Sequence, residues 1–278
     1  LLKSGIFENM WIQPAAGDAG GALGAALLAS YSKFGVQRIQ HENGRDMQKG
    51  SYLGPKYSNN EIQSYLEKNE YPYHSFEDTD DRLEVIAKAI SCGKIVGYFS
   101  GRMEYGPRAL GARSILGDPR NPKTQSKMNL KIKYRESFRP FAPSVMFDEA
   151  DEYFDIETES PYMLLVASVK RQRRSKTNQD HNYNSNDDLL KTINQSRSDI
   201  PAVTHIDYSA RVQTINPNDK HDYYQLISIF EKLTGYGVLV NTSFNVRGEP
   251  IVCSPHDAYI CFMRTEMDIL VLENSILY

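Results

Sequence analysis

The stretch KIVGYFSGRMEYGPRALGARSILGDPR, residues 94–120, joins a hydrophobic run to a segment rich in arginine and glycine. Residues 80–93 precede it and carry apolar side chains at helical spacing, namely Leu83, Ile86, Ala87 and Ile90. Gly93 is placed to end that helix, and KIVGYFS is typical of a strand. The loop-like segment 101–120 would then lie beyond the carboxyl end of a strand, where open α/β sheets bind ligands.

The residue types of segment 101–120 suit a negatively charged ligand. The segment holds four arginines and four glycines. Glycine lets a chain approach a ligand closely and take up positive φ, while arginine offers a planar fork of donors suited to phosphate or carboxylate. Together these residues indicate anion recognition.

Charge is distributed unevenly along the 278 residues, although the formal net charge is only −3. Residues 101–140 hold ten Lys and Arg against three Asp and Glu, a local charge of +7. Residues 141–160 hold seven acidic side chains and no basic one. A basic block therefore adjoins an acidic one, which is not the pattern of an evenly solvated surface. The length allows one large domain or two modest ones.

Cysteine usage and hydrophobic runs favour a cytoplasmic protein. Three cysteines without metal-type spacing indicate reduced thiols rather than a disulfide framework. The longest weakly polar run, AAGDAGGALGAALLAS, is interrupted by Asp18 and is too short to cross a bilayer. LLKSGIFENM does not read as a signal peptide. The chain starts without methionine, in what reads as structured sequence, so we expect a fragment of a longer protein.

Local signals place the remaining elements. Residues 14–34 predict a glycine-rich turn and a small-residue helix that packs against a neighbour and lacks a core of its own. Predicted helices follow at 122–133, 223–235 and 254–263, with predicted strands at 162–170, 202–215, 237–245 and 268–278. Ser254, Pro255 and Asp257 form the start signal of one helix. The polar stretch 171–199 lacks apolar periodicity and predicts a mobile insertion.

Two further segments carry groups that suit phosphate. KYRESFRPF, residues 133–141, places three cations within seven residues, and NTSFNVRGEP, residues 241–250, follows a strand. Backbone amides, hydroxyls and cations from both could converge on one phosphorylated ligand. The sequence has no Walker lysine loop, no GxGxxG turn and no HExxH pair, so its site is built differently from the familiar nucleotide and zinc sites.

Four motifs in order resemble the C-terminal domain of the NodU/CmcH carbamoyltransferases. They are GRMEYGPRALGARSIL, KYRESFRPFAPS, THIDYSARVQT and NTSFNVRGEPIV. The resemblance covers residues from about 85 to 278 apart from the polar insertion, and PAAGDAGGALGAAL is similar to the last part of the family's actin-like domain. It implies two units, an actin-like remnant at 1–40 and a YrdC-like domain at 41–278. The fold implied for the second is a twisted, open, mixed α/β sheet with flanking helices around a basic cavity.

This resemblance also implies an activity. The C-terminal domain of the family makes carbamoyl-adenylate from carbamoyl phosphate and ATP, with Mg²⁺ accompanying ATP. The actin-like domain then transfers the carbamoyl group to an acceptor hydroxyl of a sugar or natural product. Charge develops on phosphoryl oxygens in both steps, so preorganised cations and backbone amides can stabilise it without a covalent nucleophile.

Site residues follow from matching the motifs. YrdC-like domains carry Lys-x-Arg and Ser-x-Asn signatures, which this sequence matches at Lys133, Arg135, Ser243 and Asn245. We take as catalytic Lys133, Arg135, Arg108 and His205, with His205 expected near carbamate or its phosphate. We take as binding residues Ser243, Asn245, Thr242, Arg102, Arg113, Arg211 and Arg247. Asp18 matches an aspartate that would join two upstream histidines to bind a metal such as iron, and those histidines are absent. Ala112 and Tyr208 stand where the family often has Asn and Gly.

Other interpretations stay open at this point. Arg102, Arg108 and Arg113 could form ordinary ion pairs with Glu104 or with the acidic cluster at 148–159. YrdC-like folds present a basic concavity, so an RNA-binding module is one rival, although the net negative charge favours a protein that binds no nucleic acid. A nucleotide-binding regulatory module without chemistry is another. A homodimer is compatible with the sequence, and the acceptor is not specified by it.

Overall fold

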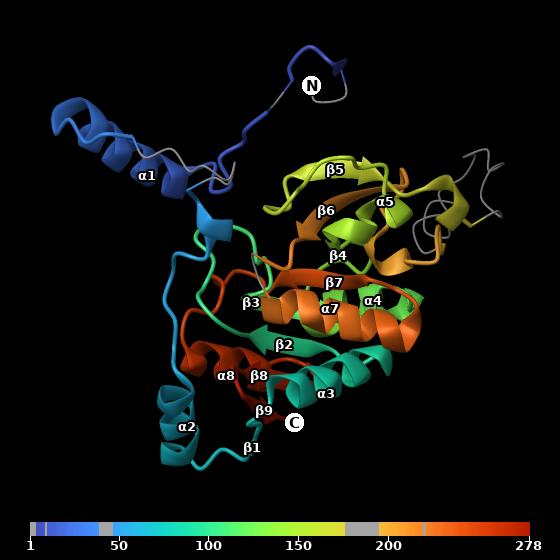
Figure 1. Ribbon diagram of the computed structural model, residues 1–278. Coiled ribbons are helices and arrows are strands. Elements are labelled where there is room, and N and C mark those ends of the chain that lie inside the picture. Colours follow the sequence, from blue (N-terminus) through green and yellow to red (C-terminus); the bar gives the residue numbers. More distant parts are fainter. Residues whose placement is uncertain (1–3, 9, 39–46, 176–194, 219–220) are drawn as a thin grey trace.

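A computed structural model describes residues 4–8, 10–38, 47–175, 195–218 and 221–278. It contains a nine-stranded open sheet of order β1-β9-β8-β2-β3-β7-β4-β6-β5 (Figure 1). The strands are β1 His74–Ser75, β2 Val96–Phe99, β3 Arg113–Gly117, β4 Ala142–Met146, β5 Leu165–Ser168, β6 Ser209–Ile215, β7 Val238–Ser243, β8 Ile269–Leu272 and β9 Ser275–Leu277. The pairs β2/β8 and β4/β6 are parallel and the other pairs antiparallel, so the sheet is mixed, as predicted.

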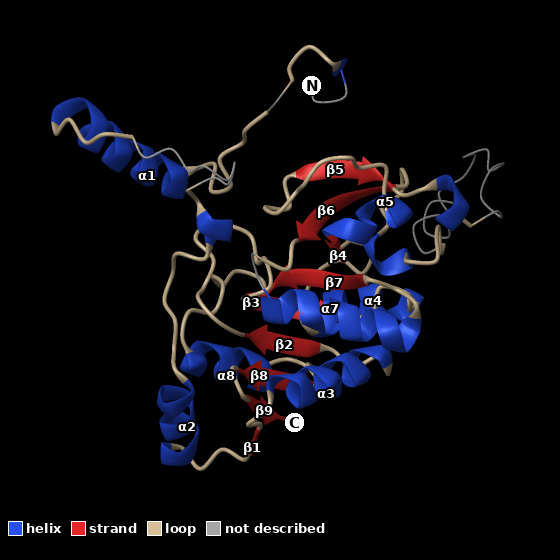
Figure 2. Cartoon of the chain, viewed as in Figure 1, coloured by secondary structure: helices blue, strands red, loops and turns tan. Residues whose placement is uncertain are grey.

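Helices cover both faces of this sheet (Figure 2). The α-helices are α1 Asp18–Leu28, α2 Asn59–Lys68, α3 Thr79–Ser91, α4 Pro122–Lys131, α5 Ala150–Tyr153, α7 His221–Thr234 and α8 Pro255–Met263. Alternate residues of a strand point to opposite faces, which gives two cores. Val96 and Tyr98 of β2 pack with α3 and α7, whereas Phe99 packs in a second cluster with residues of α2, α4 and α8. The fold is therefore a mixed α/β sheet between two helical layers, and its YrdC-like topology stays a prediction.

Several predicted element ends are confirmed. α3 buries Leu83, Ile86, Ala87 and Ile90, the residues that predicted it. Gly93 follows this helix with φ +81°, a left-handed conformation that costs glycine little. α8 begins with a capping box, in which Ser254 accepts from the Asp257 amide and the Asp257 carboxylate accepts from the Ser254 amide. These signals are local, so the sequence alone contains them.

Two sequence predictions were wrong in part. Segment 101–120 was expected to be loop-like, but Arg113–Gly117 forms the buried strand β3 between β2 and β7. Its short apolar core, Ile115 and Leu116, is flanked by arginine and glycine, so composition concealed a strand that cross-strand pairing stabilises. The predicted strand 202–215 is β6 only from Ser209 onward, because residues 201–203 form a 3₁₀ helix started by Pro201.

The N-terminal part contributes little to the cores. α1 has no buried residue and continues as a π-helical turn at Ala29–Lys33, and in Figure 1 it extends away from the sheet. Contacts with the sheet domain include Ala15, which is buried, and Tyr105, whose hydroxyl donates to the Ala19 carbonyl at 2.6 Å. The Trp11 ring also meets the Tyr162 ring edge to face, with 6.0 Å between the centroids. No helix in the described ranges is long and apolar enough to cross a membrane.

The ends of the predicted insertion at 171–199 are well anchored. Arg173 stacks on the Tyr153 ring, with Cζ 3.9 Å from its centroid, and pairs with Asp199 at 2.8 Å. The Ser175 amide donates to the Arg197 carbonyl at 2.8 Å, which joins the two ends. Residues 176–194, most of the predicted mobile stretch, lie outside the described residues.

Candidate functional site

A cavity of about 440 Å³ lies at one end of the central strands. β7 ends there at Ser243, and its antiparallel neighbours β3 and β4 begin there. β6 is parallel to β4 and starts at the same end. The lining comes from segments far apart in the chain: 107–109, Arg135 and 139–142, Met163 and Val166, His205 and Arg211, and 241–243. The mixed sheet therefore gathers the arginine-rich loop and the ends of four strands at one place.

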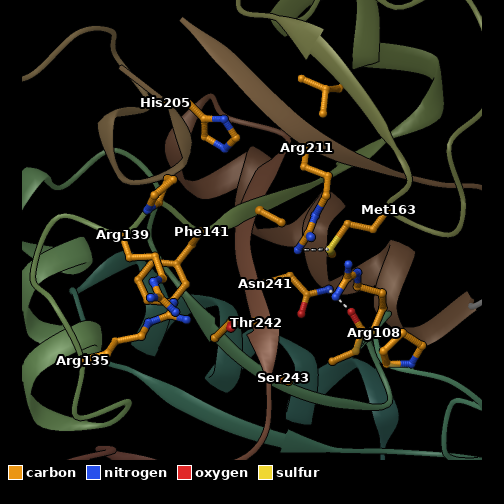
Figure 3. A pocket seen from close by; sticks show the side chains of 15 residues that line it. Arg108, Arg135, Arg139, Phe141, Met163, His205, Arg211, Asn241, Thr242 and Ser243 are labelled. Atoms are coloured by element: carbon orange, nitrogen blue, oxygen red, sulfur yellow. Dashed lines mark hydrogen bonds between the residues drawn. The ribbon is translucent and has the colours of Figure 1, made fainter. Parts of the chain in front are cut away.

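The side chains of Arg108 and Arg211 come together on one side of this cavity, across from Arg135 and Arg139 (Figure 3). Each has a buried Nε without a hydrogen-bond partner among the described residues, and Arg211 Nη2 lies 3.7 Å from the Met163 sulfur. Burial, and next the charge of Arg108, lowers the pKa of Arg211. In the described part of the chain neither arginine forms an ion pair. Two like charges without a carboxylate between them favour binding of an anion.

Lys133 lies just past α4 and is 4% exposed. Its Nζ donates to the Ser243 carbonyl, to Ser243 Oγ at 3.2 Å, to the Asn245 carbonyl at 2.9 Å and to Asn245 Oδ1 at 2.7 Å. Burial, with a smaller contribution from Arg135, lowers the pKa of Lys133 to about 7. The Lys-x-Arg and Ser-x-Asn motifs, separated by more than 100 positions, are thus in direct contact.

A second, smaller cavity of about 240 Å³ adjoins the first. Lys133, Asn245 and Arg247 line it, and it shares Arg135, Arg139 and Ser243 with the larger cavity. Arg139 also borders a third cavity of about 650 Å³ on the far side of His205. The pKa of Arg135 falls to about 10, first through burial and then through repulsion from Arg139. The cavities of 440 and 240 Å³, called below the large and the small cavity, form one cationic region that arginine side chains divide.

A buried amide network supports the loop that carries Arg108. Asn241, 1% exposed, donates from Nδ2 to the Ala109 carbonyl at 3.2 Å, to Ser144 Oγ at 3.0 Å and to Gln213 Oε1 at 2.8 Å. Gln213 in turn donates to the Leu110 carbonyl at 3.0 Å. These bonds tie the loop before β3 to β4, β6 and β7, so strand pairing sets the position of Arg108.

The same loop depends on a carboxylate and a glycine. Glu104 Oε1 accepts from the amides of Leu110 at 2.6 Å and Ala112 at 2.7 Å. Gly111 has φ +101°, and a Cβ there would lie 2.3 Å from Cδ1 of Tyr223. A side chain at this position would force the loop and α7 apart.

Arg113 and Arg102 do not line the cavities. Arg113 is 0% exposed, lies 3.4 Å from the Phe99 ring centroid and donates to the carbonyls of Gly101 and Ala112 at 3.1 and 2.9 Å. Burial lowers its pKa to about 10. Arg102 is exposed and donates to the Gly54 carbonyl at 2.8 Å. Neither arginine makes the ion pair with Glu104 that was the alternative to ligand binding. Both donate to backbone carbonyls instead.

The other predicted site residues are placed as follows. His205 lines the large cavity, with Nδ1 2.9 Å from Ser209 Oγ, and burial lowers its pKa. Thr242 lines the same cavity, and Arg247 is an exposed residue of the small one. Asp18 is exposed at the start of α1. No group of three metal-ligating side chains lies in the part of the chain that the structure describes.

Residues absent from the predicted set also line the large cavity. Arg139 borders all three cavities and pairs with Glu136 at 3.1 Å, where both side chains are about half exposed. Phe141 lies under Arg135, with 4.9 Å between the guanidinium and the ring centroid. Arg139 and Phe141 belong to KYRESFRPF and Asn241 begins NTSFNVRGEP, so all three lie in quoted segments and could have been chosen from them.

Comparison with known proteins extends this description. Residues 87–278 match the description Carbamoyltransferase C-terminus, and residues 1–27 match Carbamoyltransferase N-terminus. The chain belongs to the carbamoyltransferase family. The C-terminal match contains both cavities and every predicted site residue except Asp18.

The carbamoyltransferase chain has several curated relatives. It is 53% identical to uncharacterized protein sll1178 of Synechocystis, which it matches over 100% of this chain and 44% of that protein. It is 38% identical to nodulation protein NolNO of Sinorhizobium fredii, over 98% of this chain and 36% of that protein. Nodulation protein U of Rhizobium fredii is 31% identical over 89% of this chain and 36% of its own length. The chain thus spans less than half the length of these relatives.

Solved structures include the crystal structure of full-length HypF in the phosphate- and nucleotide-bound form. It shares 17% identity with this chain and superposes with a TM-score of 0.45, covering 72% of this chain and 22% of that one.

Proposed function

We propose that residues 41–278 catalyse formation of carbamoyl-adenylate from carbamoyl phosphate and ATP, for transfer to an acceptor hydroxyl. One observation carries the proposal: Arg108, Arg135, Arg211 and Lys133 converge on two adjoining cavities with no carboxylate among the described lining residues except Glu136 at the rim. A region with this charge suits two phosphorylated substrates bound side by side. Family membership supplies the carbamoyl chemistry.

The small cavity suits the triphosphate of ATP. Lys133 and Arg135 line it, and Ser243 Oγ donates to Asn245 Oδ1 at 2.7 Å, with Lys133 Nζ in contact with both side chains. Arg108, Arg211 and His205 suit carbamoyl phosphate or the carbamate derived from it in the large cavity. Arg135 and Ser243 border both cavities, so they are placed to contact the phosphate at which the two substrates would meet.

The chemistry needs charge stabilisation rather than a protein nucleophile. Water cleaves carbamoyl phosphate to carbamate and inorganic phosphate. A carbamate oxygen then attacks the α-phosphorus of ATP, the bond to the β-phosphate oxygen breaks, and pyrophosphate leaves. Negative charge grows on phosphoryl oxygens in both steps, and fixed guanidinium groups in a partly buried site stabilise it. Arg102 and Arg113 contribute indirectly in this proposal, by holding the loop backbone.

Described residues do not form a resident metal site, because no three carboxylate, histidine or cysteine side chains cluster. Mg²⁺ would therefore enter with ATP. Asp18 is a single exposed carboxylate, so an iron site built on it would need ligands beyond the described residues.

Transfer to the acceptor concerns the whole proteins of the family. Only residues 1–27 of this chain match the N-terminal description. A sugar or natural-product hydroxyl is the acceptor class that we propose by family membership, and we propose neither a nucleic-acid nor a membrane partner. We also propose a homodimer, which a measurement of molecular mass in solution tests.

The test is pyrophosphate release by the purified chain with Mg²⁺, ATP and carbamoyl phosphate, with each substrate omitted in turn. We expect release that requires both substrates and that falls at least about 100-fold in Lys133→Met, since loss of one preorganised charge donor commonly costs that much. Lys131→Met is the matched control, because Lys131 is also near the end of α4 but is half exposed and pairs with Glu266.

Other outcomes separate the alternatives. Binding of ATP without release would favour a nucleotide-binding regulatory module. Binding of RNA without carbamoyl phosphate, with steep dependence on salt, would favour an RNA-binding module. If the chain binds neither ATP nor carbamoyl phosphate, the proposal is overturned.

A further inference from the structure

Asn129 is a fully buried amide beneath the cationic segment. It lies in α4, and its exposure is 0%. Its Nδ2 donates to the Ser137 carbonyl at 3.0 Å and to the Arg139 carbonyl at 2.7 Å, while its Oδ1 accepts from Arg135 Nε at 2.6 Å. Its backbone carbonyl accepts from the Arg135 amide at 3.0 Å. One side chain thus closes the loop that carries two cavity arginines.

These bonds leave the two terminal guanidinium nitrogens of Arg135 available to donate to a ligand. Nε is bound to Asn129 and the guanidinium lies over the Phe141 ring at 4.9 Å. Within the described residues the terminal nitrogens of Arg135 make no hydrogen bond, although the side chain borders both cavities. A guanidinium held at Nε and on one face loses little further freedom when its terminal nitrogens bind phosphate.

The orientation of the Asn129 amide is determined by its partners. Nδ2 faces two backbone carbonyls, which can only accept, and Oδ1 faces an arginine N–H, which can only donate. An isosteric aspartate would put an oxygen against those carbonyls, and an alanine would leave the carbonyls and Arg135 Nε without partners. Only an amide satisfies all three neighbours.

We propose that Asn129 is a positioning residue that fixes the Arg135 guanidinium at the junction of the two cavities, ready for a phosphate ligand. The proposal rests on the proposed function for its part in catalysis, but not for its effect on anion binding. Asn129 touches no substrate in this scheme and acts through Arg135.

The positioning role of Asn129 is tested by the binding of inorganic pyrophosphate to the full chain. Calorimetry compares four proteins: the unaltered chain, Asn129→Ala, Arg135→Gln and the double variant. We expect Asn129→Ala to weaken binding about tenfold. We expect it to add little to the effect of Arg135→Gln, because residues that act through one contact are not additive. Circular dichroism and thermal unfolding show whether each variant is folded at the temperature used.

Gln125→Ala is the matched control. Gln125 is also in α4, and its Nε2 donates to the Phe138 carbonyl of the same loop at 2.8 Å without contacting Arg135. We expect this variant to bind pyrophosphate as the unaltered chain does. A loss equal to that of Asn129→Ala would show that loop anchoring in general, and not the bond to Arg135, determines affinity.

Remaining outcomes are equally decisive. Multiplicative effects of Asn129→Ala and Arg135→Gln would overturn the positioning role. If the unaltered chain fails to bind pyrophosphate, the anion site itself is wrong. If it binds pyrophosphate and the cycle is non-additive, but ATP and carbamoyl phosphate give no turnover, the positioning role stands and the proposed function fails.

Discussion

Arg108 and Arg113 show how much a few positions change the role of one residue type. Both belong to the same motif, yet Arg108 lines the large cavity whereas Arg113 is buried and packs on the Phe99 ring. Arg113 is the first residue of a buried strand, so its side chain direction is set by the pleat. Arg108 lies in the preceding loop, which Glu104 and Asn241 hold in place. Side-chain environment, not residue type, separates a candidate ligand-binding arginine from a structural one.

Lys133 predicts a pH dependence of anion binding. Its folded pKa is lowered to about 7 by burial, so the cation is present below that pH and is lost above it. A bound anion favours the charged form, so sulfate affinity should fall by up to about tenfold per pH unit above about pH 7. Calorimetric titration with sulfate, which does not itself titrate in this range, measures the effect.

Lys133→Met supplies the control for that measurement. Cys261 and Arg135 are the titratable neighbours that act on Lys133, and neither changes charge near neutral pH, because the pKa of Cys261 is raised to about 11 and that of Arg135 is about 10. The variant should bind sulfate weakly at every pH in the range. A pH profile unchanged by the substitution would assign the titration to another group.

Elements differ in how far tertiary contacts stabilise them. α7 buries Tyr223, Leu226, Ile227 and Phe230 against the sheet, whereas α1, with three glycines in 11 residues, buries none. An isolated helix shorter than about 12–15 residues is marginal in water, and glycine weakens it further. The local sequence pattern predicted both helices, but their stabilities depend on packing.

Hydrogen exchange should separate these two helices. We expect the amides of α1 to exchange more than about 100-fold faster than those of α7, because opening α1 exposes no core while opening α7 removes one side of the sheet. The intact chain is labelled with deuterium and then digested, and mass spectrometry of the peptides resolves both segments. Equal protection would mean that α1 is covered in solution by a surface of this chain or of a second copy.

At the scale of the whole molecule, the site depends on the fold of the entire sheet domain. Its lining comes from β4, β5, β6, β7 and the loops around them, and these strands pair only in the folded sheet. A ligand that binds this assembled site stabilises the folded state alone, because the unfolded chain has no such site. Binding should therefore appear in global unfolding.

Pyrophosphate at about 100 times its dissociation constant should stabilise the chain by about 2.7 kcal/mol. For a chain of this size the unfolding midpoint should rise by roughly 5–11 °C, since each kcal/mol shifts it by about 2–4 °C. Differential scanning calorimetry measures the shift. The Arg108→Met, Arg211→Met double variant should show a much smaller one at the same concentration, and an equal shift would place the bound anion elsewhere.

The sequence by itself determined the features that depend on neighbouring residues. Helix α3 and its end at Gly93, the capping box of α8, the strand β2 and the motifs of the carbamoyltransferase family could all be identified from runs of a few residues. These follow from local hydrogen bonding, backbone conformation and periodicity. The Lys-x-Arg and Ser-x-Asn motifs were likewise recognised before their contact was known.

Only the tertiary structure decided which of those residues meet. The register of β7 against β3 and β4 places Asn241 opposite Leu116 and Ala142, and it brings Ser243 to Lys133 from more than 100 positions away. The same packing buries Arg113 and places Arg139 at the border of three cavities. It also brings Asn129 Oδ1 within hydrogen-bond distance of Arg135 Nε. Strand order and burial arise from contacts between distant segments, and no local pattern in the chain encodes them.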